Sequence, residues 1–296
     1  MSLAVAIDLG GTQIRSALVD VQGHILNRVA TATKAMAGPT VVIQQLVDAA
    51  KEVSRDTDPA SIRGVGVSSP GPLDTEQGIA IGLPTIKDFD SVPLRALLQK
   101  QLPHRVFLEN DGIAAAIGEW KFGAGQGFRS LVYVTVSTGI GGGVIVDGHV
   151  MRGRKGMAGH IGHMAIIPNG LPCNCGSIGC WEAYAAGPAF TARAQAKAAV
   201  DVFRAAKEGD AEAQKHVDVE AHYLGLGITS LLHLYSPDVV IMGGGLSNAF
   251  DQLYPGISNY VTQHAMPAFR DVPIVKAALA GNSGLVGAAA LVFQNT

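Results

Sequence analysis

The chain has 296 residues, of which 48% are hydrophobic and 16% are charged, and its formal net charge is −2. This composition supplies a large core but no basic surface for nucleic acid or anionic lipid, and no apolar run reaches the roughly 20 residues that a membrane-spanning helix needs. The first residues carry neither a charged segment nor a small-residue cleavage site, so we expect a cytoplasmic, soluble protein of one large domain or two medium ones.

Two segments of similar pattern, residues 4–26 and 131–151, each predict a strand, a glycine-rich turn and a returning strand. Between them the sequence predicts a helix over 40–54, strands over 62–71 and 105–110, and a helix from Asp111 to about Phe122. Beyond residue 186 it predicts helices over 188–207 and 211–234, strands over 237–247 and 272–277, and a last helix from about residue 283. Alternating strands and helices are typical of α/β layers, and the repeated segment suggests two related halves.

The segment Asp8-Leu9-Gly10-Gly11-Thr12 places a carboxylate, two glycines and a hydroxyl at the first predicted turn. A phosphate chain needs several backbone N–H donors at close range, and glycine lets the backbone approach because it has no Cβ. Thr12 can add a hydroxyl donor, and Asp8 can hold magnesium, usually through water, since this ion prefers oxygen ligands. Taken alone, the pentapeptide fits an ordinary hairpin turn equally well.

Two further glycine runs change that balance. The corresponding turn of the second segment contains Ser137, Thr138, Gly139, Gly141 and Gly142, so two facing turns can grip a phosphate chain from both sides. A third run, formed by Gly243, Gly244 and Gly245, follows its own predicted strand and suits contact with a flat adenine or its ribose. None of the three is followed by Gly-Lys-Ser/Thr or opens a helix with Gly-x-Gly-x-x-Gly, which disfavours a Walker A loop and a dinucleotide fold.

Three polar residues, Glu109, Asn110 and Asp111, end a predicted strand and run directly into an alanine-rich helix. In phosphoryl transfer to a hydroxyl, a carboxylate accepts the proton and orients the attacking oxygen. Asp111 is therefore the candidate general base. The alternative is that Asp111 or Asn110 caps the helix, and the two roles can coexist.

All three cysteines of the chain lie within eight positions, starting ten residues after His163: Cys173, Cys175 and Cys180. Three thiolates and one imidazole make a tetrahedral zinc set, and a site closed by four protein ligands is structural. His160 is near enough to be the fourth ligand instead, and a redox pair is the other interpretation, although Cys-x-Cys lacks the usual spacing. The metal would order a loop with little core of its own and fix neighbours such as Glu182.

Five motifs, in this order, resemble those of the ROK family of repressors, open-reading-frame proteins and sugar kinases: AIDLGGT, ENDGIAAA, TVSTGIGGG, GHIGHM and CNCGSIGCWE. The resemblance covers nearly the whole chain. It implies an α/β actin-like (ribonuclease H-like) ATPase fold with two duplicated α/β domains around a central cleft. We expect a smaller domain of residues 1–110 plus 282–296, a larger domain of residues 111–281 with the zinc loop, and a homodimer or homotetramer.

The resemblance also implies ATP-dependent phosphorylation of a hexose, of the glucose type, at a primary hydroxyl, with Mg²⁺-ATP in the interdomain cleft. Asp111 would be the general base and Asn110 would contact the sugar hydroxyls. His163 and Glu182 would reach the sugar, and His163 would also bind the structural zinc ion with the three cysteines. The nucleotide would bind two phosphate loops and an adenosine-binding run, formed by Asp8, Gly10, Gly11, Thr12, Thr138, Gly139, Gly141, Gly142, Gly243, Gly244 and Gly245.

The chain departs from the family pattern at the sugar site. The family usually has a glutamate where this chain has His160, and that glutamate accepts hydrogen bonds from sugar hydroxyls. Some bacterial N-acetylmannosamine kinases resemble this chain in having histidine there. Gly82 and Ile86 stand where glucokinases resembling this chain have asparagine and tryptophan. The substrate therefore stays open between glucose and an N-acylated hexosamine, either N-acetylmannosamine or N-acetylglucosamine.

A sugar-responsive transcriptional regulator of the same family is a second interpretation, and a sugar-binding protein without catalysis is a third. ROK regulators carry a helix-turn-helix before the first glycine turn, whereas Asp8 already opens that turn here. Regulators can also lose the base or a phosphate-loop glycine, and this chain keeps both. The sequence favours the kinase, with a sugar and a nucleotide as partners and neither nucleic acid nor membrane.

Overall fold

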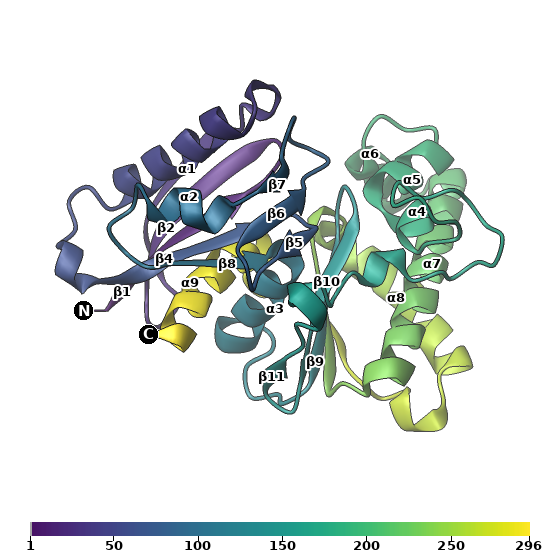
Figure 1. The fold of residues 1–296 in the computed structure, drawn as a ribbon. Helices are drawn as coiled ribbons and strands as arrows, with labels where there is room; N and C mark the ends of the chain where they lie inside the picture. The colour runs from purple at the N-terminus through teal and green to yellow at the C-terminus, as the bar shows by residue number, and fades with distance from the viewer. Residues whose placement is uncertain (1) are drawn as a thin grey trace. The chain divides into compact units, whose positions relative to one another are not determined.

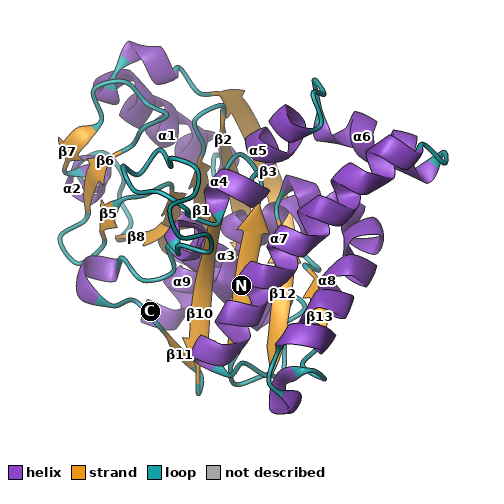
Figure 2. Ribbon diagram, turned by 90° about the vertical axis from the view of Figure 1, so that its right-hand side faces the viewer, coloured by secondary structure: helices purple, strands orange, loops and turns teal. Residues whose placement is uncertain are grey.

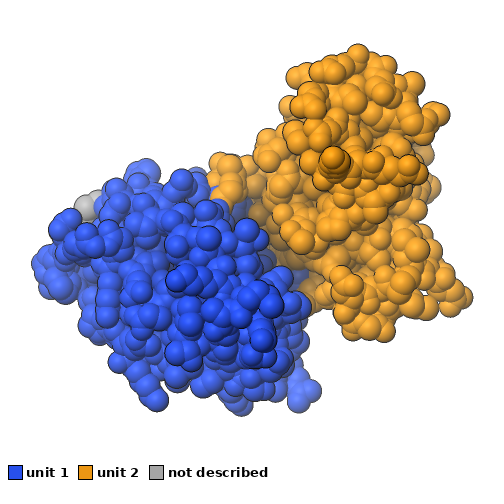
Figure 3. All heavy atoms as spheres, turned by 90° about the horizontal axis from the view of Figure 1, so that it is seen from above, with its two compact units in different colours: residues 1–126, 150–159, 282–296 blue, residues 127–149, 160–281 orange. Residues whose placement is uncertain are grey.

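A computed structural model describes residues 2–296, which form two compact units (Figures 1 and 3). The first unit comprises the described residues up to Gln126 together with Val150–Gly159 and Asn282–Thr296, and the second comprises Gly127–His149 and His160–Gly281. Within residues 2–296, no helix combines the length and the apolar character that crossing a membrane requires.

A five-stranded mixed sheet forms the centre of the first unit, in the order β3-β2-β1-β4-β8. Its strands are β1 (Leu3–Leu9), β2 (Gln13–Asp20), β3 (Ile25–Ala32), β4 (Ile62–Ser69) and β8 (Val106–Asn110). β1 pairs antiparallel with β2 and parallel with β4, and β8 runs parallel to β4 on its other side. A small antiparallel sheet and a short helix complete the unit: β5 (Leu73–Asp74), β6 (Ile79–Gly82), β7 (Asp90–Val92) and α2 (Leu94–Gln99).

Helices cover both faces of the first sheet because the side chains of β1 alternate between two apolar clusters. Val5 and Ile7 pack in a cluster with residues of α1 (Pro39–Val53), whereas Ala4 and Ala6 pack with residues of α9 (Ser283–Asn295). α9 also lies against α3 (Asp111–Phe122), where a Cβ on Gly287 would come within 1.7 Å of a backbone carbonyl oxygen. Only glycine allows two helices to approach so closely.

The compact units differ in their bounds from the predicted division at residues 110 and 111. Helix α3 and the segment Val150–Gly159 lie in the first unit. The physical reason is burial, since Ile113 and Ile117 on α3 share an apolar cluster with Ala290 on α9. The polar residues at the end of β8 and the helix that follows them therefore belong to one packed body.

The second unit repeats the strand pattern of the first. Its sheet has the order β11-β10-β9-β12-β13 and consists of β9 (Leu131–Val136), β10 (Ile140–Val146), β11 (His149–Val150), β12 (Val239–Gly243) and β13 (Ile274–Lys276). β9 pairs antiparallel with β10 and parallel with β12, as β1 does with β2 and β4. Counted along the chain, the two sheets have the same strand order. This confirms the predicted α/β fold with two duplicated halves.

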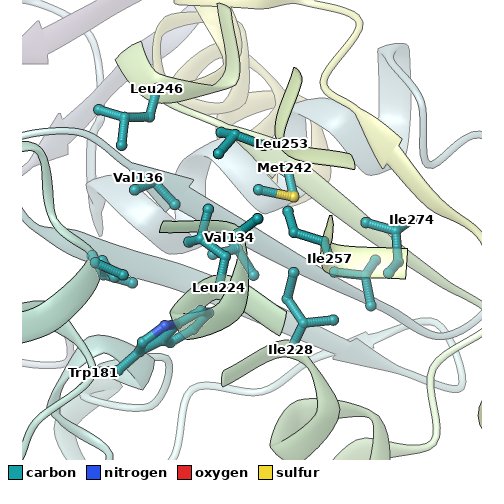
Figure 4. Packing of buried hydrophobic residues seen from close by; sticks show 14 of the residues in the cluster. Val134, Val136, Trp181, Leu224, Ile228, Met242, Leu246, Leu253, Ile257 and Ile274 are labelled. Carbon is teal, nitrogen blue, oxygen red and sulfur yellow. The ribbon is translucent and has the colours of Figure 1, made fainter. Parts of the chain in front are cut away.

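Besides the sheet, helices supply most of the buried apolar residues of the second unit. Figure 2 shows these helices. They are α4 (Glu182–Ala185), α5 (Gly187–Arg193), α6 (Ala199–Lys207), α7 (Ala211–Tyr235) and α8 (Phe250–His264). Figure 4 shows how Leu224 and Ile228 of α7 and Ile257 of α8 pack with Trp181 and Met242 in the largest cluster. The single helix predicted over 188–207 is two helices, because Gln195 takes a φ of 50° just after α5 ends.

Candidate functional site

The first glycine turn connects β1 to β2 and is held by hydrogen bonds to its backbone. The Thr33 hydroxyl donates to the carbonyl of Gly10 at 2.7 Å, and the Thr33 N–H donates to the carbonyl of Thr12 at 2.9 Å. A Cβ on Gly11 would lie 2.6 Å from the Cβ of Thr85, so a larger residue would displace this neighbour. Thr12 is exposed. The Gly10 N–H also donates to the Gln13 carbonyl at 3.0 Å, so the turn has a fixed shape with Thr12 at its exposed end.

Asp8, near the end of β1, has partners on both neighbouring strands. The Ser68 hydroxyl donates to its Oδ1 at 2.9 Å, and Arg15 Nε donates to its Oδ2 at 3.1 Å. Neither partner is evident from the local sequence pattern. The signal that identifies them is strand register, because Arg15 and Ser68 stand directly opposite Asp8 on β2 and β4. The carboxylate is thus held in place, with 13% of its side-chain surface exposed.

Asn110 caps helix α3, and Asp111 is the first residue of the helix. The Asn110 Oδ1 accepts hydrogen bonds from the N–H of Gly112 at 3.0 Å and the N–H of Ile113 at 3.4 Å. Asp111 Oδ1 accepts from the N–H of Gly112 at 2.8 Å. Between the two candidates that the sequence offered for the cap, the structure assigns this role to Asn110.

The surroundings of Asp111 raise its affinity for a proton. The residue is open to water, yet the protein packed around its carboxyl group weakens hydration of the charged form and raises its pKa to about 6. The negative charge of Asp8 raises the pKa further, whereas the Gly112 N–H lowers it. A carboxylate with a pKa near 6 is still ionised at neutral pH and accepts a proton more readily than an ordinary aspartate.

Glu109 directly precedes Asn110 and Asp111 in the chain, and it is 1% exposed. Its Oε1 accepts from the N–H of Asn110 at 3.1 Å, and its Oε2 accepts from Arg152 Nε at 2.9 Å. Burial raises the pKa of Glu109, and the charge of Arg152 opposes that rise. No local sequence pattern points to Arg152, which lies more than forty positions away in the chain. The hydrogen-bonded ion pair between Glu109 and Arg152 therefore holds the end of β8 in place.

The second glycine turn connects β9 to β10 and is shorter than its glycine run. The turn comprises Ser137, Thr138 and Gly139, with the Ser137 N–H donating to the Gly139 carbonyl at 2.9 Å. Gly141 and Gly142 already belong to β10. A Cβ on Gly142 would lie 2.5 Å from Ile161 Cδ1, so this glycine has a packing role in the structure.

Glu182 lies directly against the second turn. Its Oε2 accepts from the N–H of Ile140 at 2.9 Å, and a Cβ on Gly139 would come within 2.5 Å of the same oxygen. The third glycine run lies beside this turn as well. Gly244 has a φ of 84°, and a Cβ there would lie 2.4 Å from the carbonyl oxygen of Val136.

The third run is also close to the turn residues themselves. Gly243 ends β12, and a Cβ on Gly245 would lie 3.7 Å from the Ser137 hydroxyl. The Ser247 hydroxyl donates to the carbonyl of Gly244 at 2.7 Å and fixes the run's shape. The predicted site residues thus form two groups, one with Asp8 and Asp111 in the first unit and one with Glu182 in the second.

The cysteine loop, residues 171–180, brings all its thiols to one point together with His163. One ligand atom from each of Cys173, Cys175, Cys180 and His163 can lie within 4.8 Å of the others. Cys175 Sγ and Cys180 Sγ are 3.7 Å apart, and Cys173 Sγ is 3.6 Å from His163 Nδ1. A tetrahedron with zinc–sulfur bonds of about 2.3 Å and a zinc–nitrogen bond of about 2.0 Å has edges of about 3.8 and 3.5 Å. The donor set and its spacing fit zinc, and all three thiols are free.

His160 stands apart from this cluster. Its ring centre is 6.3 Å from that of His163, with the two rings stacked at 24°. Its carbonyl accepts the His163 N–H at 3.1 Å and so opens the short turn Ile161–His163. Of the two histidines that the sequence offered as the fourth ligand, His163 is the one in the cluster.

The backbone of the cysteine loop is tied to the core of the second unit at its end. The Cys173 N–H donates to the Ser177 carbonyl at 2.8 Å within the loop. Immediately after Cys180, the fully buried Trp181 donates through Nε1 to the Tyr223 carbonyl at 2.8 Å. The next residue is Glu182, so the ordered loop, the core and the carboxylate at the second turn are consecutive in the chain.

Comparison with known proteins identifies the family. The sequence model described as "ROK family" matches residues 4–295. A glucokinase of Thermotoga maritima is 35% identical over 98% of this chain and 97% of its own length. A ROK family glucokinase from Streptomyces griseus, solved in complex with glucose and AMPPNP, matches with a TM-score of 0.87 and 31% identity over 99% of this chain and 100% of that chain. A xylose repressor of Bacillus spizizenii is 28% identical over 99% of this chain and 77% of its own length. The predicted actin-like α/β ATPase fold is confirmed by the solved structure, and the chain belongs to the ROK family.

Proposed function

We propose that this protein is an ATP-dependent sugar kinase that phosphorylates a hexose of the glucose type at its primary hydroxyl. The observation that carries the proposal is Asp111, an exposed carboxylate at a strand–helix junction with a pKa raised to about 6. The glucokinases among the relatives of this chain support it. So does the close approach at Gly11, where a Cβ would lie 2.6 Å from the Cβ of Thr85 and would crowd the first turn.

In the proposed reaction, Asp111 accepts the proton of the sugar hydroxyl while that oxygen attacks the γ-phosphorus of ATP. The bond from the γ-phosphorus to the bridging oxygen breaks, and ADP leaves. The side-chain carbonyl oxygen of Asn110 caps the helix. Its side-chain amide nitrogen would therefore donate a hydrogen bond to the sugar. Glu182 and His163, which lie in the second unit, would contact other sugar hydroxyls.

The phosphate chain would bind to backbone N–H groups at Gly11 and Thr12 and at Thr138 and Gly139, while the Gly10 N–H closes the first turn by donating to the Gln13 carbonyl at 3.0 Å. Mg²⁺ would neutralise negative charge on the phosphates while the γ-phosphoryl group is transferred. Asp8 fits the role of an outer ligand through water, because its Oδ1 has a second lone pair beyond its contact with Ser68, whereas its Oδ2 accepts from both Nε and Nη2 of Arg15. Adenosine would lie along Gly243, Gly244 and Gly245, and Gly141 and Gly142 would support the second loop from within β10.

Zinc would be structural. Four protein ligands close the coordination sphere and leave no position for substrate, so the ion would order the loop that ends at Trp181 and Glu182. We therefore assign no chemical step to it.

A coupled ADP-release assay tests the proposal directly. The panel is glucose, mannose, fructose, N-acetylglucosamine and N-acetylmannosamine, each with Mg²⁺-ATP. We expect turnover with glucose above that with the other sugars. Absence of ADP release with every sugar, from protein that binds nucleotide, would remove the kinase proposal and leave a sugar-binding or regulatory protein.

His160 favours a second substrate class. A glutamate accepts two hydrogen bonds, whereas a neutral imidazole donates one and accepts one. The donor can reach an acyl carbonyl, which glucose lacks. An N-acylhexosamine kinase, with N-acetylmannosamine or N-acetylglucosamine as substrate, is the alternative that the same panel would reveal.

A further inference from the structure

A buried ion pair joins α5 to α7 within the second unit. Arg193, the last residue of α5, donates through Nη2 to Oε2 of Glu220 on α7, and the Glu220 side chain is fully buried. Arg193 Nε and Glu220 Oε1 have no hydrogen-bond partner in the part of the chain that the structure describes. Such a pair adds little to stability, because loss of hydration offsets the attraction, and apolar residues often replace it without harm. Its presence here points to a role in positioning.

Arg193 makes a second contact that leads toward the cysteine loop. Its Nη1 donates to the backbone carbonyl of Tyr184 at 2.9 Å. Its guanidinium carbon lies 5.5 Å from the ring centre of Tyr223, which is 5.0 Å from the ring centre of Tyr184. The Tyr184 hydroxyl accepts the N–H of Leu171 at 2.7 Å, at the start of the cysteine loop. A continuous chain of contacts therefore runs from Glu220 to that loop.

Tyr184 belongs to α4, which is a single turn of four residues. A helix so short is not stable on its own and takes its position from what it contacts. Its first residue, Glu182, accepts a hydrogen bond from the Ile140 N–H at the second glycine turn. The carbonyl of its third residue, Tyr184, accepts a hydrogen bond from Arg193 Nη1. One short element thus carries both the carboxylate at that turn and the anchor of the cysteine loop.

We infer that Arg193 and Glu220 are positioning residues that hold α4 in place, and with it the Glu182 carboxylate and the cysteine loop. The effect on sugar binding rests on the proposed function, whereas the effect on the cysteine loop does not. Arginine is required rather than lysine, because its planar fork donates to a carboxylate and a carbonyl together, and a single ammonium group does not reproduce that geometry.

Two variants separate positioning from stability. The double variant Arg193→Met with Glu220→Leu removes both charges at similar volume, and Arg193→Lys keeps a positive charge opposite Glu220. Thr229→Val is the control, because Thr229 is a buried residue of the same helix whose hydroxyl also lacks a partner among residues 2–296. Circular dichroism and thermal melting establish which variants fold.

Two readouts are measured on the zinc-loaded full chain: the KM values for sugar and ATP, and the rate of zinc release to a chelating dye. In both test variants we expect a sugar KM raised about tenfold, the size of effect typical of outer-shell partners, with the ATP KM within about twofold of wild type. Zinc release should accelerate by a similar factor. Thr229→Val should match wild type in both readouts.

A folded test variant with wild-type zinc release or a wild-type sugar KM would overturn the inference, as would equal rises in both KM values. If the double variant does not fold, Arg193→Lys decides by the same criteria. If the wild-type protein phosphorylates no sugar, the proposed function fails, and zinc release in Arg193→Lys still decides whether the pair positions the cysteine loop.

Discussion

Asn110 Oδ1 and Asp111 Oδ1 share the N–H of Gly112 at the start of helix α3, and Asn110 alone also takes the N–H of Ile113 as the helix cap. Adjacent polar residues at a strand–helix junction often compete for the same backbone donors. Here only the Gly112 N–H is shared, and it engages one carboxylate oxygen of Asp111. Asp111 keeps an exposed carboxylate whose remaining lone pairs can accept a proton from a substrate.

Replacing Asp111 by asparagine should remove that acceptor while keeping the shape of the side chain. We expect kcat to fall by about 10²–10⁴-fold, the usual contribution of a general base, with nucleotide and sugar binding measured by calorimetry changed by less than about threefold. Asp48→Asn, an exposed residue of α1, is the matched control and should retain wild-type kcat. An Asp111→Asn enzyme with a third or more of the wild-type rate would exclude Asp111 from the mechanism.

The raised pKa of Asp111 makes activity depend on pH. The active form is the carboxylate, so kcat/KM should be half its maximum near pH 6, approach a fall of tenfold per pH unit well below pH 6, and level off above about pH 7. An unperturbed aspartate would place this limb near pH 3.9, about two units lower. The measurement is a kcat/KM profile from pH 4.5 to 8, with circular dichroism at each pH to verify the fold. A flat profile down to pH 5 would contradict the assignment.

The protein should contain one zinc ion per chain, bound by His163 and the three cysteines. Cys175→Ser removes one thiolate at an exposed position, and we expect it to lower the melting temperature by at least about 4 °C, a shift of roughly 1–2 kcal/mol in a domain of this size. Asn174→Ser, one position away, changes no ligand and serves as the control. Elemental analysis that finds no zinc in protein purified without chelators would contradict the site, and so would equal melting temperatures for Cys175→Ser and wild type.

His160 should influence the choice of sugar. His160→Glu restores two acceptors, and a sugar hydroxyl left unpaired in a dry site loses roughly 1–3 kcal/mol. We therefore expect the ratio of kcat/KM for glucose to that for N-acetylmannosamine to rise about tenfold or more in the variant. A change below about threefold, under 1 kcal/mol, would mean that His160 packs beside the cysteine loop without selecting the substrate.

Much of the fold was predictable from local patterns. The strand–turn–strand repeat required only apolar runs broken by glycines, and the structure has the same strand order in both units. The zinc ligands were predictable because three of them lie close together in the chain. Helix α3 was predictable because polar residues precede an alanine-rich run.

Other features depend on contacts that local patterns do not contain. Arg15 and Ser68 are partners of Asp8 through the register of three strands, which becomes evident only when the sheet order is established. Arg152 and Glu109 are 43 positions apart, and Arg193 and Glu220 are 27 apart. Two of the glycines assigned to the second loop, Gly141 and Gly142, lie in β10. The sequence alone does not distinguish a glycine run that forms a turn from one that packs within a strand.

The central claim is that this chain transfers the γ-phosphate of ATP to the primary hydroxyl of a hexose, with Asp111 as the base. The most direct measurement is phosphorus NMR of the product formed from glucose and Mg²⁺-ATP by wild type and by Asp111→Asn at equal enzyme concentration. The account predicts a phosphate ester coupled to two protons of a CH₂ group with wild type, and at most about one hundredth of that signal in the same time with the variant. Free inorganic phosphate as the sole new species, or equal ester formation by both proteins, would contradict it.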